Sequence, residues 1–440
     1  MQVTTHASTQ EFHRDSPFDR LRATRLDLTR QSAVALAAVA IVGLHVADDA
    51  FLQPEPGTSA LDHLPGGLGQ LAALGVAAAA YRRGRAGLQA TIALVVGLLA
   101  LVIGAASAGY TTITVGPSGD DFTGLLVLPA GLALIAVGLA TLWRSRKLND
   151  RRRWRYTRRA LIAVAAPVLA YATIAPLGFG YIITHVMRQT VPAANLGAAH
   201  ENVSFKTSDG LELQGWYVRS KNGAAVIAFP GRNGPQAHTR MLARHGYGVL
   251  LFDRRGEGRS EGDSNLLGWG GDKDILAAID FLKTRPDVDP GRIGGIGLSV
   301  GGELMLQAAA ETDELAAVVS EGAGTRQLSE QLEEFHGFER VLNAPGFLFV
   351  TAGTALFSSS AAPPNLTDVA PKITQPLFVI WAPNGGNIEH MSKEYYELAS
   401  SRSKQIWAMP TAKHVGGIRN QPKEYERRVV GFFDSTLLAG

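Results

Sequence analysis

Two serines of this chain stand in the five-residue pattern Gly-x-Ser-x-Gly. Residues 297–301 read GLSVG around Ser299, and residues 258–262 read GRSEG around Ser260. The pattern is typical of a nucleophilic serine on a sharp turn between a strand and a helix, where a neighbouring backbone N–H can face a developing oxyanion. The five letters alone do not separate the two candidates, so the flanking sequence has to decide.

The flanking sequence favours Ser299. It follows RIGGIGL, an apolar run typical of a buried strand, and precedes VGGELMLQAAA, a good helix former. Ser260 instead follows FDRRGEG and precedes EGDSN, a polar turn without a helical pattern. We therefore predict Ser299 as the nucleophile, and we interpret GRSEG as a loop in which Asp253, Arg255 and Gly256 brace a turn. A decayed site that keeps the Ser299 turn only for folding is the alternative.

The elements that would position Ser299 lie in the second half of the chain. After a linker over residues 188–202, short runs rich in β-branched and other apolar residues alternate with segments of helical composition. Two early strands followed by this alternation predict an α/β fold over residues 203–440, a mostly parallel sheet flanked by helices. Near residues 326–365 a helical insertion interrupts the pattern, where a lid could cover the carboxyl ends of the strands.

Four separated motifs of this region resemble those of the α/β-hydrolase superfamily, closest to its dienelactone-hydrolase-like and prolyl-oligopeptidase-like branch. They are FPGRNG, FDRRGEGRSEGD, GLSVGG and PTAKHVGG, in that order. The resemblance implies a serine hydrolase in which the nucleophile, the acid and the histidine follow one another along the chain. It also implies that His414, in the loop after KQIWAM, is the base that takes the serine proton. His390 and His336 are rivals in poorer positions.

The acid that would orient the imidazole is the least determined residue. The superfamily usually carries Asp after the strand that corresponds to PLFVIW, but the loop here, APNGGNIEHMSKEYY, has none. Glu389 is the nearest carboxylate and keeps the expected order, whereas Asn387 in the Asp position would leave a weakened triad. Glu321, directly after AAVVS, is the alternative acid, because some related enzymes place it there; otherwise it caps a helix or braces a loop.

The resemblance also indicates two backbone donors for an oxyanion hole. One is the N–H of Val300, the residue after the nucleophile. The other belongs to the loop after AAVIAF, which begins with Pro230-Gly231 where the superfamily often has His-Gly. Because Pro230 has no N–H, Arg232 is the expected second donor, and its side chain could also meet an anionic substrate group.

The first half of the chain predicts a membrane region. Five apolar stretches within residues 32–187 carry no Lys, Arg, Asp or Glu near their middles, and about 17–25 such residues span a bilayer. The stretches are 32–52, 64–81, 86–109, 122–143 and 160–187, of which the second is the shortest. We expect an all-α transmembrane bundle of about five helices after a cytoplasmic leader over residues 1–31.

Charges in the connecting segments indicate one topology. Lys and Arg gather in the leader, in the second loop and in residues 144–159, which hold nine, while the first and third loops hold none. Since basic segments stay cytoplasmic, the N-terminus is expected inside and everything after residue 187 outside. Residues 1–187 carry a net charge of +6 and residues 188–440 a net of −3, which argues against nucleic-acid binding by the second half.

The composition excludes further chemistry. The 440 residues include no Cys, which excludes disulfides, thiolate zinc sites and cysteine nucleophiles. The sequence shows no metal-ligand cluster or phosphate-cradling glycine loop, so no metal or cofactor is expected. The leading hypothesis is a membrane-anchored serine hydrolase that cleaves an ester or related acyl substrate, small or lipid-like, through an acyl-enzyme. The alternatives are a hydrolase-like domain that only binds a partner, and an acyltransferase or peptidase on the same fold.

Overall fold

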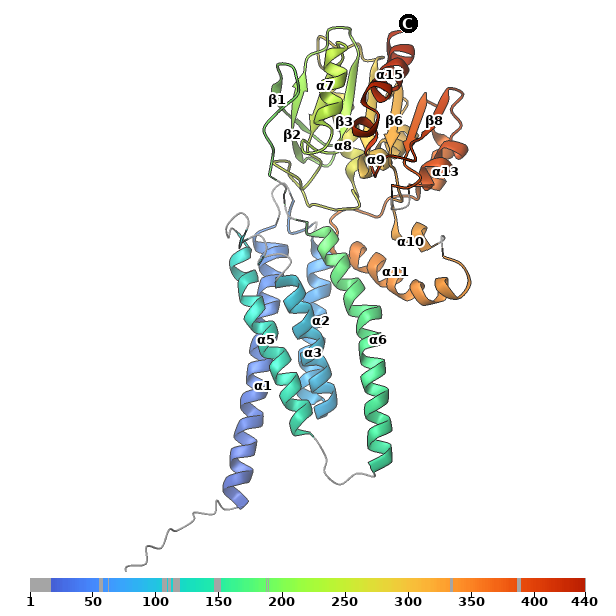
Figure 1. The fold of residues 1–440 in the computed structure, drawn as a ribbon. Coiled ribbons are helices and arrows are strands. Elements are labelled where there is room, and N and C mark those ends of the chain that lie inside the picture. The colour runs from blue at the N-terminus through green and yellow to red at the C-terminus, as the bar shows by residue number, and fades with distance from the viewer. Residues whose placement is uncertain are drawn as a thin grey trace, which may run out of the picture.

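The computed structural model describes residues 17–54, 58–61, 63–104, 109, 112–113, 119–145, 152–186, 188, 190–332, 335–385 and 389–439. A helical bundle built from the first half of the chain stands end to end with an α/β domain built from the second half (Figure 1). The first 16 residues of the expected leader lie outside the described residues, and the first helix begins at Pro17, within that expected leader.

A sheet of eight strands forms the centre of the α/β domain, in the order β1-β2-β4-β3-β5-β6-β7-β8. The strands are β1 (Glu201–Lys206), β2 (Glu212–Val218), β3 (Ala225–Phe229), β4 (Gly248–Phe252), β5 (Ile293–Leu298), β6 (Ala317–Glu321), β7 (Leu377–Trp381) and β8 (Lys404–Ala408). The pairs β1–β2 and β2–β4 are antiparallel, and every other neighbouring pair is parallel. The predicted mostly parallel sheet with an antiparallel start is therefore confirmed.

Helices cover both faces of this sheet. They are α7 (Gln236–Arg244), α8 (Gly271–Lys283), α9 (Val300–Glu311), α13 (Met391–Leu398) and α15 (Pro422–Phe433), with the short α12 (Leu366–Val369) and α14 (Gly417–Asn420). Side chains alternate along β4: Leu250 and Phe252 join the core under α8 and α9, whereas Val249 and Leu251 join the core under α7 and α15. Because both faces are buried, the inner strands are mostly apolar, as the sequence indicated, and β6 carries Ser320 and Glu321 at its end.

The described residues of the N-terminal bundle form five long helices. They are α1 (Pro17–Ala47), which continues as a π-helical turn (Asp48–Leu52), α2 (Leu64–Arg83), α3 (Ala86–Gly104), α5 (Asp121–Arg144) and α6 (Arg152–Thr184). Glycines bring α3 and α5 together: a Cβ atom at Gly97 would lie 2.9 Å from the carbonyl oxygen of Gly131, and the reverse distance is the same. Close backbone contact through small residues is typical of helices that pack in a membrane.

Among the described residues of this bundle, three segments are long and apolar enough to cross a membrane by length and composition. They are Arg30–Leu52, Ala86–Gly104 and Asp121–Arg144, which correspond to the first, third and fourth predicted spans. The second and fifth stretches form α2 and α6, but over the described residues neither meets the same criterion, so their crossing stays a prediction. Helix α11 (Gly337–Phe357), inside the expected insertion, does meet it, which the sequence analysis did not anticipate.

The bundle meets the α/β domain where α6 ends. The N–H of Leu266 donates to the carbonyl oxygen of Ile183 at 2.8 Å, and Oγ of Ser264 donates to the carbonyl oxygen of Val186 at 2.5 Å. Both donors belong to the loop between β4 and α8. This loop is thereby held against the end of α6, on the side of the α/β domain that faces the bundle.

Candidate active site

Ser299 lies alone between the end of β5 and the start of α9. Its backbone angles are φ 54° and ψ −125°, a combination that residues with a side chain seldom adopt. Such strain persists only where the surroundings fix it, and it is typical of functional turns. Here the Ser299 N–H donates to the carbonyl oxygen of Glu321 on the neighbouring strand β6, at 2.8 Å. The strand, turn and helix expected around this serine are all present.

The glycines that flank the turn leave no room for side chains. A Cβ atom at Gly297 would lie 2.1 Å from the carbonyl oxygen of Gly301, and one at Gly301 would lie 2.6 Å from the carbonyl oxygen of Phe229. Heavy atoms do not approach so closely without displacement of the backbone. The turn can therefore pack against the end of β3 only because both positions are glycine.

His414 lies beside the Ser299 hydroxyl. The imidazole extends from the loop after β8, and its Nε2 atom is 2.9 Å from Oγ of Ser299. The two residues are 115 positions apart, so the fold alone brings them together. This distance allows the serine to donate its proton to the imidazole, which is the arrangement of a nucleophile and its base. The His414 side chain is 28% exposed, so a substrate can reach it.

Glu389 contacts the other nitrogen of the same ring. Its Oε1 atom hydrogen-bonds Nδ1 of His414, and its Oε2 atom accepts the N–H of Ala382 at 2.7 Å. The carboxylate is buried, and its hydrogen bond to the ring raises the pKa of His414 above the ordinary value. Of the two acids that the sequence left open, the structure brings Glu389 to the imidazole. Asn387, the other candidate in this loop, lies outside the described residues.

A family model described as X-Pro dipeptidyl-peptidase (S15 family) matches residues 184–377, a range that contains β1 to β6 and the nucleophile turn. The C-terminal part of this chain is an α/β-hydrolase domain.

Individual relatives of the hydrolase domain carry different names. An Escherichia coli K12 protein, the uncharacterized protein YfhR, is 27% identical over 257 residues, which cover 54% of this chain and 81% of that one. The thiohydrolase apmlB of Arthrinium phaeospermum is 38% identical over 128 residues, 27% of this chain and 42% of that protein. Among solved structures, the Pyrococcus furiosus esterase Pf2001 aligns with a TM-score of 0.46 and 22% identity, covering 57% of this chain and 99% of the esterase.

Glu321, the alternative acid, lies away from the imidazole and braces the loop that carries it. Its Oε1 atom accepts the N–H of Gly417 at 2.8 Å, and its Oε2 atom accepts the hydroxyl of Tyr425 at 2.6 Å. Burial favours the neutral carboxyl, but hydrogen bonds and the nearby His238 outweigh it and lower the pKa of Glu321. The side chain has the loop-bracing position that was the alternative to a catalytic role.

The structure differs from the sequence-based prediction at the oxyanion hole. Val300 begins α9, so its N–H has no partner within the helix and remains the predicted donor. The N–H of Arg232, however, donates to Oδ1 of Asp253 at 2.8 Å, and its Nε donates to Oδ2 of the same carboxylate at 2.8 Å. A buried guanidinium requires such a partner. Both the backbone N–H and the guanidinium of Arg232 already bind Asp253. The geometry therefore does not support Arg232 as the second oxyanion donor or as a contact for an anionic substrate.

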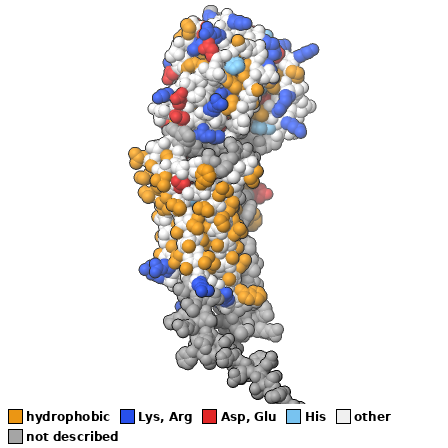
Figure 2. All heavy atoms as spheres, turned by 90° about the vertical axis from the view of Figure 1, so that its left-hand side faces the viewer, with side chains coloured by type: hydrophobic (Ala, Val, Ile, Leu, Met, Phe, Trp, Pro, Cys, Tyr) orange, Lys and Arg blue, Asp and Glu red, His pale blue; other side chains and the backbone are white. Residues whose placement is uncertain are grey.

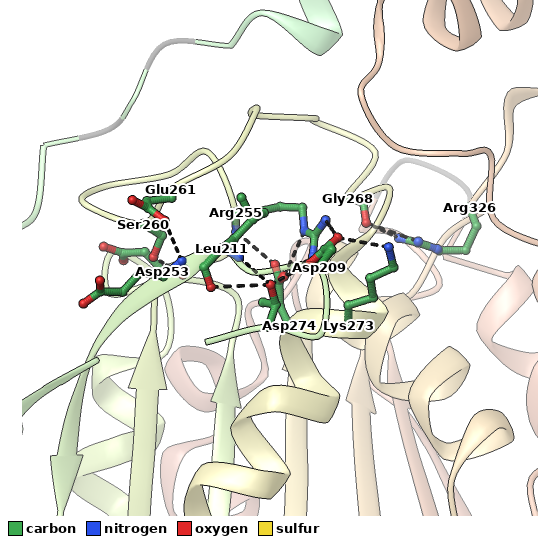
Figure 3. Close-up of polar contacts among 12 residues, drawn as sticks. Asp209, Leu211, Asp253, Arg255, Ser260, Glu261, Gly268, Lys273, Asp274 and Arg326 are labelled. Carbon is green, nitrogen blue, oxygen red and sulfur yellow. Dashed lines mark hydrogen bonds and ion pairs between the residues drawn. The ribbon is translucent and has the colours of Figure 1, made fainter. Parts of the chain in front are cut away.

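Ser260, the other serine in the Gly-x-Ser-x-Gly pattern, has a structural role. Its hydroxyl donates to the carbonyl oxygen of Asp253 at 2.6 Å and accepts the N–H of Gln214 at 2.9 Å (Figure 3). The residue is fully buried. Its oxygen joins the end of β4 to β2, in agreement with its interpretation as part of a loop.

The sequence analysis missed a cluster of buried charged side chains beside Val300, formed by Arg254, Glu303 and Arg326. Burial raises the pKa of Glu303, in the first turn of α9, to about 7. Arg326 donates to the carbonyl oxygen of Gly268 at 3.2 Å (Figure 3). A Cβ atom at Gly268 would lie 2.8 Å from Cγ2 of Val300 and 3.1 Å from Nη1 of both Arg326 and Arg254. The only sequence signal was Glu303 itself, a charged residue in an otherwise apolar helix start.

The pH dependence of activity should report the contact between His414 and Glu389. The base must be neutral to accept a proton, and the carboxylate raises its pKa, so activity should fall on acidification with a midpoint above the ordinary value of 6.5. We expect this midpoint, measured from kcat/KM for a soluble ester, to move to lower pH in Glu389→Gln. An unchanged midpoint in that variant would contradict the contact.

Paired substitutions should separate the two acids. Glu389→Gln removes the charge that orients His414 and stabilises its protonated form, so we expect kcat to fall by about 10²–10⁴-fold. Glu321→Gln keeps the imidazole contact but weakens the brace at Gly417, so it should lower the thermal unfolding midpoint and reduce kcat far less. Equal losses of kcat in the two variants, with equal unfolding midpoints, would refute this division of roles.

Proposed function

We propose that this chain is a membrane-anchored serine hydrolase that cleaves an ester or related acyl substrate through an acyl-enzyme on Ser299. The observation that carries the proposal is the chain of hydrogen bonds from the Ser299 hydroxyl through His414 to the buried Glu389. A neutral serine hydroxyl is a poor nucleophile, and an oriented base at hydrogen-bond distance removes that limitation.

The first half of the proposed reaction forms the acyl-enzyme. Nε2 of His414 takes the Ser299 proton while Oγ attacks the carbonyl carbon of the ester, and the carbonyl electron pair moves to oxygen. The Val300 N–H donates to this oxyanion. The tetrahedral intermediate then reforms the carbonyl, the bond to the leaving alcohol breaks, and His414 returns the proton to that alcohol. Glu389 holds Nδ1 of His414 throughout and stabilises the imidazolium.

The second half hydrolyses the acyl-enzyme. Water takes the place of the departed alcohol, gives a proton to His414 and attacks the acyl carbon. The collapse of the second intermediate breaks the bond to Oγ, which recovers its proton from the imidazole, and the carboxylic acid leaves. An alcohol or amine in place of water would give acyl transfer instead, so the same residues support either outcome.

The bundle supports a membrane anchor with the hydrolase domain on the extracytoplasmic side. Hydrophobic side chains cover the visible face of the bundle, and Lys and Arg gather at the end away from the hydrolase domain (Figure 2). Arg82 and Arg83 end α2 and Arg144 ends α5, whereas Asp48 and Asp121 lie at the opposite end of the bundle. Basic ends stay cytoplasmic. We propose residues 32–187 as the membrane region, 188–202 as a linker and 203–440 as the hydrolase domain with its insertion.

Acyl substrates are the class that the names of the relatives favour. One relative is named a thiohydrolase and another, from Penicillium, a polyketide transferase, and both names describe chemistry at an acyl carbon. A panel of 4-methylumbelliferyl esters, a thioester and an X-Pro dipeptide anilide, assayed with the purified full chain, tests the proposal. Turnover of esters or the thioester supports it. Turnover of the anilide alone would establish a peptidase. Absence of turnover with every substrate would favour the alternative that the domain only binds a partner.

The proposed topology has its own test. External protease should remove the hydrolase domain from intact cells, or from spheroplasts where a wall or outer membrane blocks entry, because that domain follows an odd number of proposed crossings. Protection of the domain in spheroplasts, with cleavage after detergent lysis, would overturn the assignment.

A further inference from the structure

Helix α11 carries an apolar stripe that the rest of the described chain leaves mostly exposed. The exposed side chains of the stripe are those of Phe338, Val341, Leu342, Leu348, Phe349 and Leu356, each with 37% or more of its area in contact with solvent. Because an α-helix turns by about 100° per residue, these six positions fall within an arc of about 120° on one helical face. The helix has no charged residue after Arg340. A contiguous apolar surface of this kind marks a site of interaction.

The opposite face of α11 packs on the helical bundle. A Cβ atom at Gly180 of α6 would lie 2.9 Å from the backbone nitrogen of Thr354, and the ring of Phe357 meets that of Tyr181 edge-on with centroids 5.3 Å apart. Both contacts lie near the C-terminal end of α6, next to the hydrolase domain. Figure 1 shows α11 running outward from this end of α6 at a wide angle, below the hydrolase domain.

Both ends of α11 return to the hydrolase domain. Its 21 residues correspond to about 30 Å of helix, long enough to cross a bilayer. The preceding helix α10 (Leu328–Gln331) is linked to the domain by the hydrogen bond from Gln331 Nε2 to Thr325 Oγ1, at 3.2 Å. After α11, Oγ of Ser358 accepts a hydrogen bond from Nδ2 of Asn265 at 3.1 Å. Both ends of α11 are thus tied to one domain, whereas the two ends of a helix that crosses a bilayer lie on opposite sides of it.

The segments on either side of α11 are joined to the loop that flanks the nucleophile. Arg326, ahead of α10, donates to the carbonyl oxygen of Gly268, and Ser358, after α11, contacts Asn265. Gly268 in turn lies against Val300, which follows Ser299 directly. Helix α11 is thereby connected at both ends to the side of the active site that faces the bundle.

We propose that α11 lies in the plane of the membrane, with its apolar stripe among the acyl chains of the leaflet next to the hydrolase domain, and that ester substrates reach Ser299 from that leaflet. The stripe continues the apolar surface of the bundle, since Leu356 contacts Gly66 of α2 and both α2 and α6 expose large apolar side chains such as Leu68 and Phe179. Burial of such a stripe at the bilayer interface stabilises an in-plane helix. The statement about substrates rests on the proposed hydrolase activity, and the statement about the helix rests on the proposed membrane region.

The position of α11 can be measured directly because the chain has no cysteine. Leu348→Cys, labelled with the fluorophore NBD, places a probe on the stripe, and Leu398→Cys places the same probe at an exposed apolar position of α13 in the hydrolase domain. Both full-length proteins are reconstituted in phosphatidylcholine nanodiscs, with and without lipid that carries a nitroxide on the acyl chain. We expect the nitroxide to remove most of the fluorescence at position 348 and little at position 398.

Two results would overturn this placement of α11. Equal weak quenching at the two positions, with equal access to iodide in the water phase, would place the stripe outside the membrane. Self-quenching at position 348 that rises with the number of chains per nanodisc, without quenching by nitroxide lipid, would assign the stripe to a second copy of the chain.

Substrate entry from the leaflet is tested with two esters of one leaving group. 4-Methylumbelliferyl oleate in nanodiscs samples the membrane route, and 4-methylumbelliferyl acetate in solution samples the aqueous route. The double variant Leu342→Ser, Leu348→Ser should lower the ratio of oleate to acetate turnover by about tenfold, whereas Leu398→Ser should leave the ratio unchanged. An unchanged ratio in the double variant would refute membrane entry. Absence of turnover with both esters in the wild type would instead refute the proposed function, while the quenching result still decides the position of α11.

Discussion

Replacement of Ser299 by alanine should abolish turnover of every substrate and all labelling by a fluorophosphonate probe. The probe forms a covalent bond only with an activated nucleophile, and Ser299 Oγ is the hydroxyl within hydrogen-bond distance of His414. We expect kcat to fall by about 10⁵-fold or more, the loss that follows when a serine nucleophile is removed from a working triad. Labelling of wild type and variant is compared by gel fluorescence on the purified full chain.

Ser260→Ala is the matched control for this experiment. It removes the same atom from the same five-residue pattern, but the hydroxyl it removes joins β4 to β2 at a buried position. The control should therefore retain labelling and show a lower thermal unfolding midpoint, whereas Ser299→Ala should retain the wild-type midpoint. Labelling that survives in Ser299→Ala and disappears in a folded Ser260→Ala protein would reverse our assignment of the nucleophile.

Replacement of His414 by alanine should have an effect of similar size. Without the imidazole, Ser299 has no base within hydrogen-bond distance among the described residues, so we expect kcat to fall by about 10⁴–10⁶-fold. The residue lies in a loop and its side chain is partly exposed, so the fold should be retained. Circular dichroism and the unfolding midpoint check the fold, and ester turnover checks the chemistry.

His336→Ala provides the comparison for His414. This histidine was a rival base in the sequence, and the structure places it at the exposed N-terminal cap of α11. We expect its removal to leave turnover of a water-soluble ester within a few-fold of the wild type. Turnover that survives in His414→Ala and is lost in His336→Ala would show that the observed imidazole contact is not the productive one.

The parts of this molecule that the sequence predicted best are those determined by local patterns. The strand before Ser299 and the helix after it follow from an apolar run, a glycine pair and a helix-forming segment, so the turn between them was predictable. The parallel sheet followed in the same way from alternation of short apolar runs and helices. The position of His414 was predictable only from its place in the motif order of the resembling superfamily.

Other features depend on partners that are distant in sequence. The N–H of Arg232 was expected to face an oxyanion, but it donates to Asp253, the residue after β4, and no local pattern encodes that pairing. The choice between Glu389 and Glu321 likewise required coordinates, because Glu321 ends β6, Glu389 follows β7, and these parallel strands end at the same edge of the sheet. The exposed stripe of α11 was hidden because hydropathy alone does not tell which face of a helix its neighbours cover.

The hydrogen bonds of Glu321 should couple the motions of Ser299 and His414. Its carbonyl oxygen accepts the Ser299 N–H, and its side chain accepts the Gly417 N–H, three residues beyond His414. Glu321 therefore connects the backbone at Ser299 to the loop that carries His414. Thermal fluctuations of Ser299 and His414 should therefore be correlated, which keeps the distance between Oγ of Ser299 and Nε2 of His414 nearly constant. Amide hydrogen exchange at 299 and 417 should accordingly speed up together when this carboxylate is removed.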